Sequence, residues 1–146
     1  MIDLQHYYVA VMDCLTLPIK GGRILLKENP DRVIEICNGV GPERFPSSLR
    51  SMIDLTHPYM ITASIIHDLR YYYGKGTVFD FIDSNLDFMD NTIVVSDNMY
   101  GRLNPMRYLA RRRARQFREL LDRFGWDAYV TAIMERKNGQ HSRVTH

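Results

Sequence analysis

The segment from Pro105 to Phe124 most narrowly restricts how this chain can fold. Its apolar residues recur at steps of three and four, which places them on one face of an α-helix. Pro105 suits the first turn of a helix, and Gly125 suits the residue that ends one. The apolar positions are Met106, Leu109, Ala110, Phe117, Leu120, Leu121 and Phe124. The segment therefore predicts a helix whose apolar face another element must cover.

Similar signals predict three more helices in the C-terminal two thirds of the chain. The first runs from about Tyr59 to Tyr73 and ends at Gly74, and the second covers roughly Val78 to Ile93. A last helix is expected from Trp126 to Arg136.

The N-terminal third has a different pattern. The runs "HYYVAVM" (6–12), "RILLK" (23–27) and "VIEIC" (33–37) are short and rich in β-branched, aromatic or other apolar residues, with turn residues between the first two. They predict short strands, and the Gly-, Pro- and Ser-rich residues 38–51 predict a loop. The expected fold class is therefore α+β and mostly helical, with short N-terminal strands and a glycine-rich loop followed by three or four packed helices.

The length and composition fit one folded domain. The 146 residues are 45% hydrophobic, which is enough for a core. We expect a single domain over residues 1–137, with a strand-rich part at 1–37, a helical part at 56–137 and a flexible tail at 138–146. Two cysteines do not make a disulfide framework, so both should be thiols.

The string "HDLRY" in the helix predicted over 59–73 contains candidate catalytic residues. His67 could act as a general base near neutral pH, and Asp68 could bind a cation beside it, since neighbours on a helix point about 100° apart. Asp83, near the start of the next helix, could orient His67, and Tyr71 could hydrogen-bond that carboxylate. The alternative is that His67 is an ordinary helix histidine with a structural partner.

The glycine loop could complete a cation site. Gly39 and Gly41 are two residues apart in "CNGVG", which lets the chain bend and turn carbonyl groups inward. Ca²⁺ takes six to eight oxygen ligands, so Asp68 needs such additional donors. The two glycines can equally be plain turn residues.

The order of these motifs resembles a known pattern. "CNGVG", then "HDLRYYYG", "FDFIDSNLDFM" and "RYLARRRARQFRELLDRFGW" are similar to segments of small uncharacterised phage and bacterial proteins with a phospholipase A-two-like arrangement. The resemblance covers roughly residues 36–127 and leaves the strand-like N-terminal third unexplained.

The resemblance implies a calcium-dependent hydrolase of lipid esters. His67 would activate water, Asp83 would orient His67, and Tyr71 would support Asp83. The implied calcium ligands are Asp68 and carbonyl groups around Asn38, Gly39 and Gly41.

An arginine stripe lies on the helix predicted over 105–124. It consists of Arg107, Arg111, Arg112, Arg115 and Arg118. These residues could bind phosphates of nucleic acid or of anionic lipid headgroups. They could instead pair with the five aspartates of residues 80–97, or with a neighbouring subunit.

Three functions are therefore expected in descending order. The first is the lipid ester hydrolase. The second is a non-catalytic virion or assembly protein that docks on a protein partner or a second copy through its arginine helix. The third is nucleic-acid binding. With neither a long apolar run nor a basic N-terminal leader, the protein is expected in the cytoplasm of the producing cell or in a virion.

Overall fold

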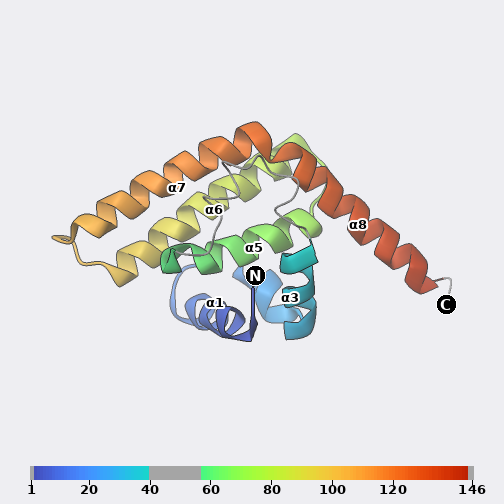
Figure 1. Ribbon diagram of the computed structural model, residues 1–146, viewed down its shortest axis with the longest axis horizontal. Coiled ribbons are helices and arrows are strands. Elements are labelled where there is room, and N and C mark those ends of the chain that lie inside the picture. Colours follow the sequence, from blue (N-terminus) through green and yellow to red (C-terminus); the bar gives the residue numbers. More distant parts are fainter. Residues whose placement is uncertain (1, 40–56, 145–146) are drawn as a thin grey trace.

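The structure is a computed structural model that describes residues 2–39 and 57–144. Within these two ranges the chain forms helices and no β-strand, so the prediction of an α+β fold with N-terminal strands was wrong for them. The elements are α1 (Leu4–Thr16), α2 (Gly22–Lys27), α3 (Pro30–Gly39), the 3-10 turn η2 (Pro58–Met60), α5 (Ile61–Tyr72), α6 (Val78–Met99), α7 (Pro105–Phe124) and α8 (Trp126–Val144). Figure 1 shows α6 and α7 as a long antiparallel pair above α5, with α1 and α3 below it.

The run predicted as the first strand lies inside α1. Tyr7 and Ala10, three residues apart, are the buried positions of this helix, so its burial follows a helical step and not an alternation. Asp3 and His6 form a capping box at its start: the Asp3 carboxylate accepts from the His6 amide at 2.9 Å, and the His6 ring accepts from the Asp3 amide at 3.1 Å. This local cap and the apolar surface of α5 outweigh the strand preference of the aromatic and β-branched residues.

The run 33–37 lies inside α3, and 23–27 lies inside α2. Val33, Ile36 and Cys37 are buried at steps of three and four, which is a helical pattern. Asn38 then fastens the end of α3 to the N-terminal segment, because its side chain accepts from the Ile2 amide and donates to the Ile2 carbonyl, both at 2.8 Å.

Helix α5 lies at the centre of the molecule and contacts α1, α2, α3, α6 and α8. Ile65, Ile66 and Leu69 are at most 1% exposed and pack on the N-terminal helices. Each such side chain contributes about 1.5–3 kcal/mol when fully buried. The predicted helix over 59–73 was confirmed, except that residues 58–60 form a 3-10 turn.

The α6–α7 hairpin forms the second layer. Ala110 and Ala114 are fully buried, which lets the helices approach closely, and the rings of Phe88 and Phe117 lie 5.7 Å apart. The predicted bounds of α7 were confirmed, whereas α6 extends to Met99 and α8 to Val144, beyond their predicted ends. The segment expected as a flexible tail is therefore helical as far as Val144. Of the helices described, none is long and apolar enough to cross a bilayer.

Candidate functional site

The side chain of His67 is held by an amide from the neighbouring helix. Its Nε2 lies 2.8 Å from Oδ1 of Asn85 on α6, and the same oxygen accepts a hydrogen bond from the hydroxyl of Tyr71 at 2.6 Å. Because an amide oxygen only accepts, Nε2 of His67 carries the proton and Nδ1 is left as an acceptor. No residue that the structure describes is hydrogen-bonded to this Nδ1.

Asn85 takes the place expected for Asp83. The Asp83 side chain is 64% exposed and lies 3.2 Å from Arg70, not against His67. Residues two apart on a helix point about 200° apart, so positions 83 and 85 cannot both face His67. The expectation that Asp83 orients His67 with support from Tyr71 is corrected accordingly: Tyr71 is in the site, and its partner is Asn85.

The network continues to α7. Nδ2 of Asn85 donates to Oδ1 of Asp122 at 2.9 Å, which fixes the orientation of the amide. The other oxygen of Asp122 lies 3.7 Å from Nε of Arg118. That Nε is buried and has no hydrogen-bond partner among the described residues. The site therefore joins α5, α6 and α7 through one fully buried asparagine.

Aromatic rings enclose His67. The rings of Tyr71 and Phe88 have centroids 4.0 Å and 5.4 Å from the imidazole, whose residue is only 6% exposed. Burial lowers the pKa of His67 to about 4, with a smaller opposing effect from the hydrogen bond with Asn85. Burial also raises the pKa of Tyr71 well above its ordinary value, so both groups are neutral near pH 7.

Asp68 follows His67 on α5 and is half-buried. Burial raises its pKa to about 8, so the carboxyl is largely protonated near neutral pH. Burial, and then the nearby charge of Asp68, raises the pKa of the Cys37 thiol as well, which makes this cysteine a small core residue and not a nucleophile.

The expected calcium ligands are only partly described. The Asn38 side chain is bonded to Ile2, Gly39 is the last residue of α3, and Gly41 lies outside the described residues. Within residues 2–39 and 57–144, no three His, Cys, Asp or Glu side chains are grouped to hold a metal ion. Asp68 alone falls short of the six to eight oxygens that Ca²⁺ takes, so the described residues do not fit a calcium site by themselves.

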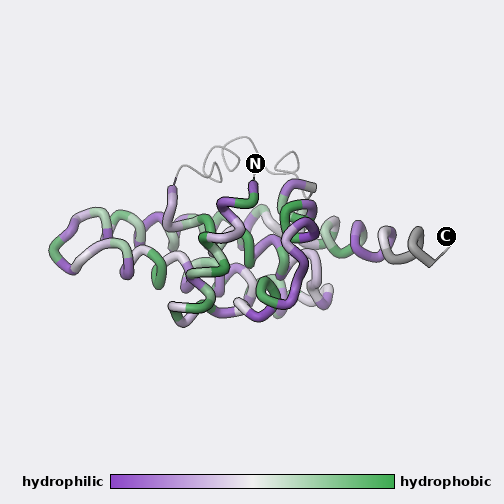
Figure 2. Tube along the Cα trace, turned by 90° about the horizontal axis from the view of Figure 1, so that it is seen from below, coloured by the Kyte–Doolittle hydropathy of each residue, from purple (hydrophilic) through white to green (hydrophobic). Residues whose placement is uncertain are grey.

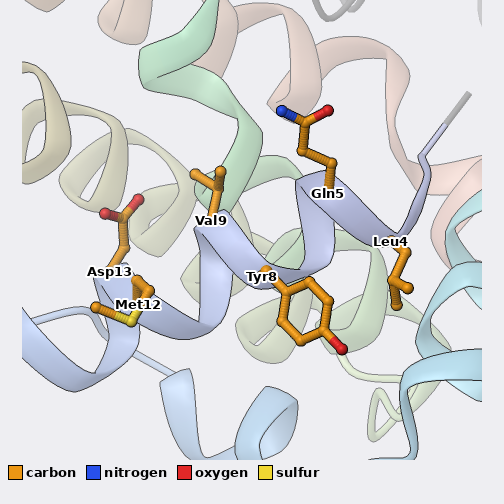
Figure 3. A pocket seen from close by; sticks show the side chains of 6 residues that line it. All are labelled: Leu4, Gln5, Tyr8, Val9, Met12 and Asp13. Carbon is orange, nitrogen blue, oxygen red and sulfur yellow. The ribbon is translucent and has the colours of Figure 1, made fainter.

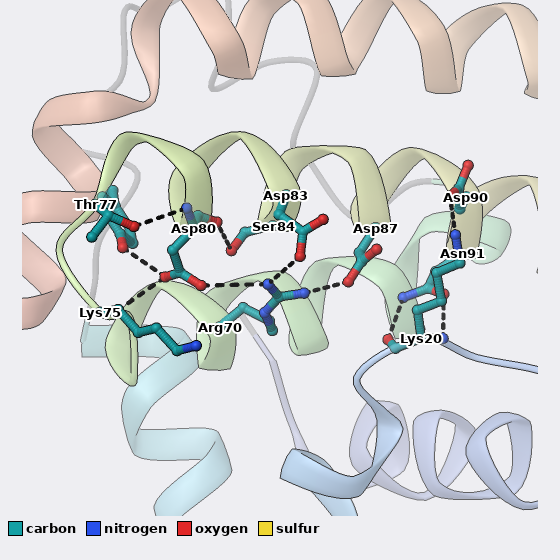
Figure 4. Close-up of polar contacts among 11 residues, drawn as sticks. Lys20, Arg70, Lys75, Thr77, Asp80, Asp83, Ser84, Asp87, Asp90 and Asn91 are labelled. Atoms are coloured by element: carbon teal, nitrogen blue, oxygen red, sulfur yellow. Dashed lines mark hydrogen bonds and ion pairs between the residues drawn. The ribbon is translucent and has the colours of Figure 1, made fainter.

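The acidic residues of α6 mostly pair with α5 and the segment after α1. Arg70 lies 3.6 Å from Asp80 and 3.2 Å from Asp83, and it also binds Asp87 (Figure 4). Further along α6, Asp90 contacts Lys20 of the segment after α1 at 2.5 Å. These pairs align α6 on the N-terminal half of the molecule.

The arginines of α7 divide into two groups. Arg107 and Arg111 bind Asp97 at 3.1 Å and 2.5 Å, which confirms for these two the pairing between the acidic and the basic helix. Arg112 and Arg115 are exposed on the outer side of α7. The other members of the predicted stripe are only partly exposed: Arg118 lies toward Asp122 with 35% of its side chain exposed, and Arg111 has 32% exposed.

A shallow hollow lies elsewhere, on the surface of α1. Figure 3 shows the six side chains that line it, all from this helix: Leu4, Gln5, Tyr8, Val9, Met12 and Asp13. His67 and Asn85 do not contribute to it.

Sequence reasoning missed Asn85, Arg70 and Asp122. The signal for Asn85 was present, because its helical steps of four and three to Phe81 and Phe88 place it on the apolar face, where an asparagine is unfavourable unless its amide has partners. Comparisons of the chain with family models, with curated proteins and with solved structures find no match.

Proposed function

We propose that this protein hydrolyses a lipid ester, with His67 as the base that takes a proton from the attacking water. The observation that carries the proposal is the contact between Nε2 of His67 and Asn85, which leaves Nδ1 as the proton acceptor. Burial keeps the imidazole neutral near pH 7, which is the form that accepts a proton, but a pKa of about 4 also makes it a weak base.

Each described residue has a defined part in this step. Asn85 fixes the tautomer and the orientation of His67, and Asp122 fixes the orientation of Asn85. When Nδ1 takes the proton of water, the resulting imidazolium donates from Nε2 to Asn85, whose amide oxygen offers a dipole and no formal charge. This arrangement stabilises the imidazolium less than a carboxylate would, which predicts slow turnover.

The choice of a lipid ester comes from the sequence resemblance to phospholipase A-two-like proteins. Calcium has no part in the proton transfer, and Asp68 is the side chain that would bind it. A cation bound at Asp68 would favour the ionised carboxylate and oppose the burial that raises its pKa.

The experiment measures fatty acid released from vesicles that contain phosphatidylglycerol, with calcium and with a chelator. Wild-type protein should release fatty acid, and His67→Gln should release none while its circular dichroism and unfolding midpoint stay close to wild type. His57→Gln is the matched control, because His57 stacks on Tyr59 and is no part of the Asn85 network. A wild-type protein that releases nothing under either condition contradicts the hydrolase.

A second candidate function is a non-catalytic virion or assembly component. The observation in its favour is the exposed pair Arg112 and Arg115 on a helix whose other side is fixed by Asp97. It predicts that Arg112→Gln with Arg115→Gln abolishes binding to an acidic partner protein or a second copy. The wild-type protein could instead bind nucleic acid with an affinity that falls steeply with salt. If the same variant lost this binding, the pair would be assigned to phosphate binding.

A further inference from the structure

The turn between α6 and α7 exposes a cluster of large apolar side chains. Leu103 is 98% exposed, and Met99, Met106, Tyr108 and Leu109 are between 37% and 58% exposed. Figure 1 places this turn at the end of the hairpin that points away from the other helices, and Figure 2 shows hydrophobic residues at the same end. Single exposed apolar residues are common, but a cluster at a protruding tip marks a contact surface.

The tip is a built turn and not a frayed end. The Asn104 amide donates to the Gly101 carbonyl at 3.0 Å, and the Asn104 side chain caps α7 by accepting from the Met106 amide at 3.0 Å. The Tyr108 hydroxyl donates to the Arg102 carbonyl at 2.9 Å. The turn therefore presents Leu103 to solvent in a fixed geometry.

The charge around the tip has one dominant sign. Residues 97–113 contain five arginines (102, 107, 111, 112 and 113) and a single acidic residue, Asp97. Asp97 already binds Arg107 and Arg111, so the positive charge on the exposed surface comes from Arg102, next to Leu103 in the turn, and from Arg112, further along α7. Apolar side chains followed by arginine and tyrosine match the depth profile of a bilayer surface, where acyl chains lie beneath anionic headgroups.

We propose that the α6–α7 tip binds anionic lipid bilayers by inserting Leu103 and its apolar neighbours among the headgroups. The apolar side of α1 is less suited to this role. Its segment, residues 3–16, contains Asp3 and Asp13 and no lysine or arginine, so charge there does not favour an anionic surface. Binding through the tip does not depend on the proposed hydrolysis, because no residue of the Asn85 network belongs to the tip.

The test is co-sedimentation of the full chain with vesicles of phosphatidylcholine alone or mixed with phosphatidylglycerol. Wild-type protein should bind the mixed vesicles and release with rising salt. Leu103→Asp should lower the affinity about tenfold or more, since a charged side chain replaces the one that enters the membrane. With a side chain 98% exposed, position 103 tolerates this change without loss of fold.

Phe79→Asp is the matched control. Phe79 is 88% exposed and lies at the other end of α6. The rise per residue of an α-helix places it about 30 Å from the tip, so this variant should bind as wild type does. Absence of wild-type binding to the mixed vesicles, equal binding by Leu103→Asp, or equal loss in Phe79→Asp would each overturn the proposal. The protein could instead self-associate with rising concentration and not bind vesicles. If Leu103→Asp abolished that self-association, the tip would be a contact with a second copy, and the bilayer proposal would be overturned.

A separate readout keeps this proposal distinct from the hydrolase. Release of fatty acid from a short-chain phospholipid dispersed as monomers requires no bilayer, so Leu103→Asp should leave that rate unchanged. Vesicle binding by His67→Gln at the wild-type level, together with loss of hydrolysis, would support both proposals through different residues.

Discussion

Asn85 Oδ1 lies 2.8 Å from Nε2 of His67, and this contact joins the middle of α5 to the N-terminal half of α6. Tyr71 donates to the same oxygen, and Asp122 accepts from the amide nitrogen. One buried side chain thus satisfies three polar groups from two other helices, which makes it a sensitive point of the fold.

Asn85→Leu should destabilise the protein by about 3 kcal/mol or more. The substitution leaves the Tyr71 hydroxyl and the His67 N–H buried without an acceptor, at about 1–3 kcal/mol each. Urea unfolding measures the loss, with Asn98→Leu as the control because Asn98 is exposed on the same helix. Equal unfolding midpoints for the two variants would show that the network contributes nothing.

Asp68→Asn should change how stability depends on pH. The native pKa of Asp68, about 8, lies above its ordinary value of 3.8, so between these values the folded state binds more protons than the unfolded state. Stability from this group is therefore present below pH 3.8 and lost as pH rises toward 8, by about 2 kcal/mol after allowance for partial exposure. The variant should lack this fall in urea titrations across the window, whereas parallel wild-type and variant profiles would contradict the assignment.

Arg70→Met should weaken the contact between α5 and α6. The substitution keeps the aliphatic stem but removes the cation that faces Asp80, Asp83 and Asp87, at a cost of about 2 kcal/mol. The loss should grow as pH rises, because burial already raises the pKa of Asp87 and the arginine opposes that rise. Arg115→Met, on the exposed side of α7, should unfold close to wild type in the same chemical denaturation series.

Gly74→Ala should displace α8. A Cβ atom at this position would lie 2.4 Å from Cε2 of Tyr129, a ring that is fully buried. Overpacking of this kind costs about 1–3 kcal/mol. Trp126, whose ring lies 5.5 Å from that of Tyr129, reports the change by fluorescence, and Gly101→Ala is the control because no atom lies within 4 Å of its added Cβ.

The sequence was informative where periodicity and terminal signals agreed. The segment 105–124 has Pro at its start, Gly after its end and an apolar stripe between, and α7 has these bounds. Residues 6–12 are too short to show a clear period, and a seven-residue run with two tyrosines and two valines fits a strand or a helix equally well. The capping box of Asp3 and His6 and the apolar surface of α5, far away in the sequence, together decide in favour of the helix.

The candidate site was predicted in part for a related reason. His67 and Tyr71 are one turn apart on a single helix, so their common face follows from the sequence. The partner on α6 depends on how that helix is rotated, and the pattern of a carboxylate-oriented histidine predicts Asp83, whereas the structure has Asn85. Arg70, which attracts Asp80, Asp83 and Asp87, helps to set the rotation, and its role is visible only in three dimensions.

The attachment of α8 has a mechanical consequence. Tyr129 accepts from the Gly76 amide at 2.8 Å and donates to Asp80 at 2.6 Å, and its ring lies 5.2 Å from that of Tyr71. Figure 1 shows that α8 runs outward from this point, so its far end can move relative to the other helices while Tyr129 stays close to its attachment. A force on the outer end of α8 would therefore act through the contact of the Tyr129 and Tyr71 rings on the Tyr71 hydroxyl. That hydroxyl and His67 share Asn85 Oδ1 as their acceptor.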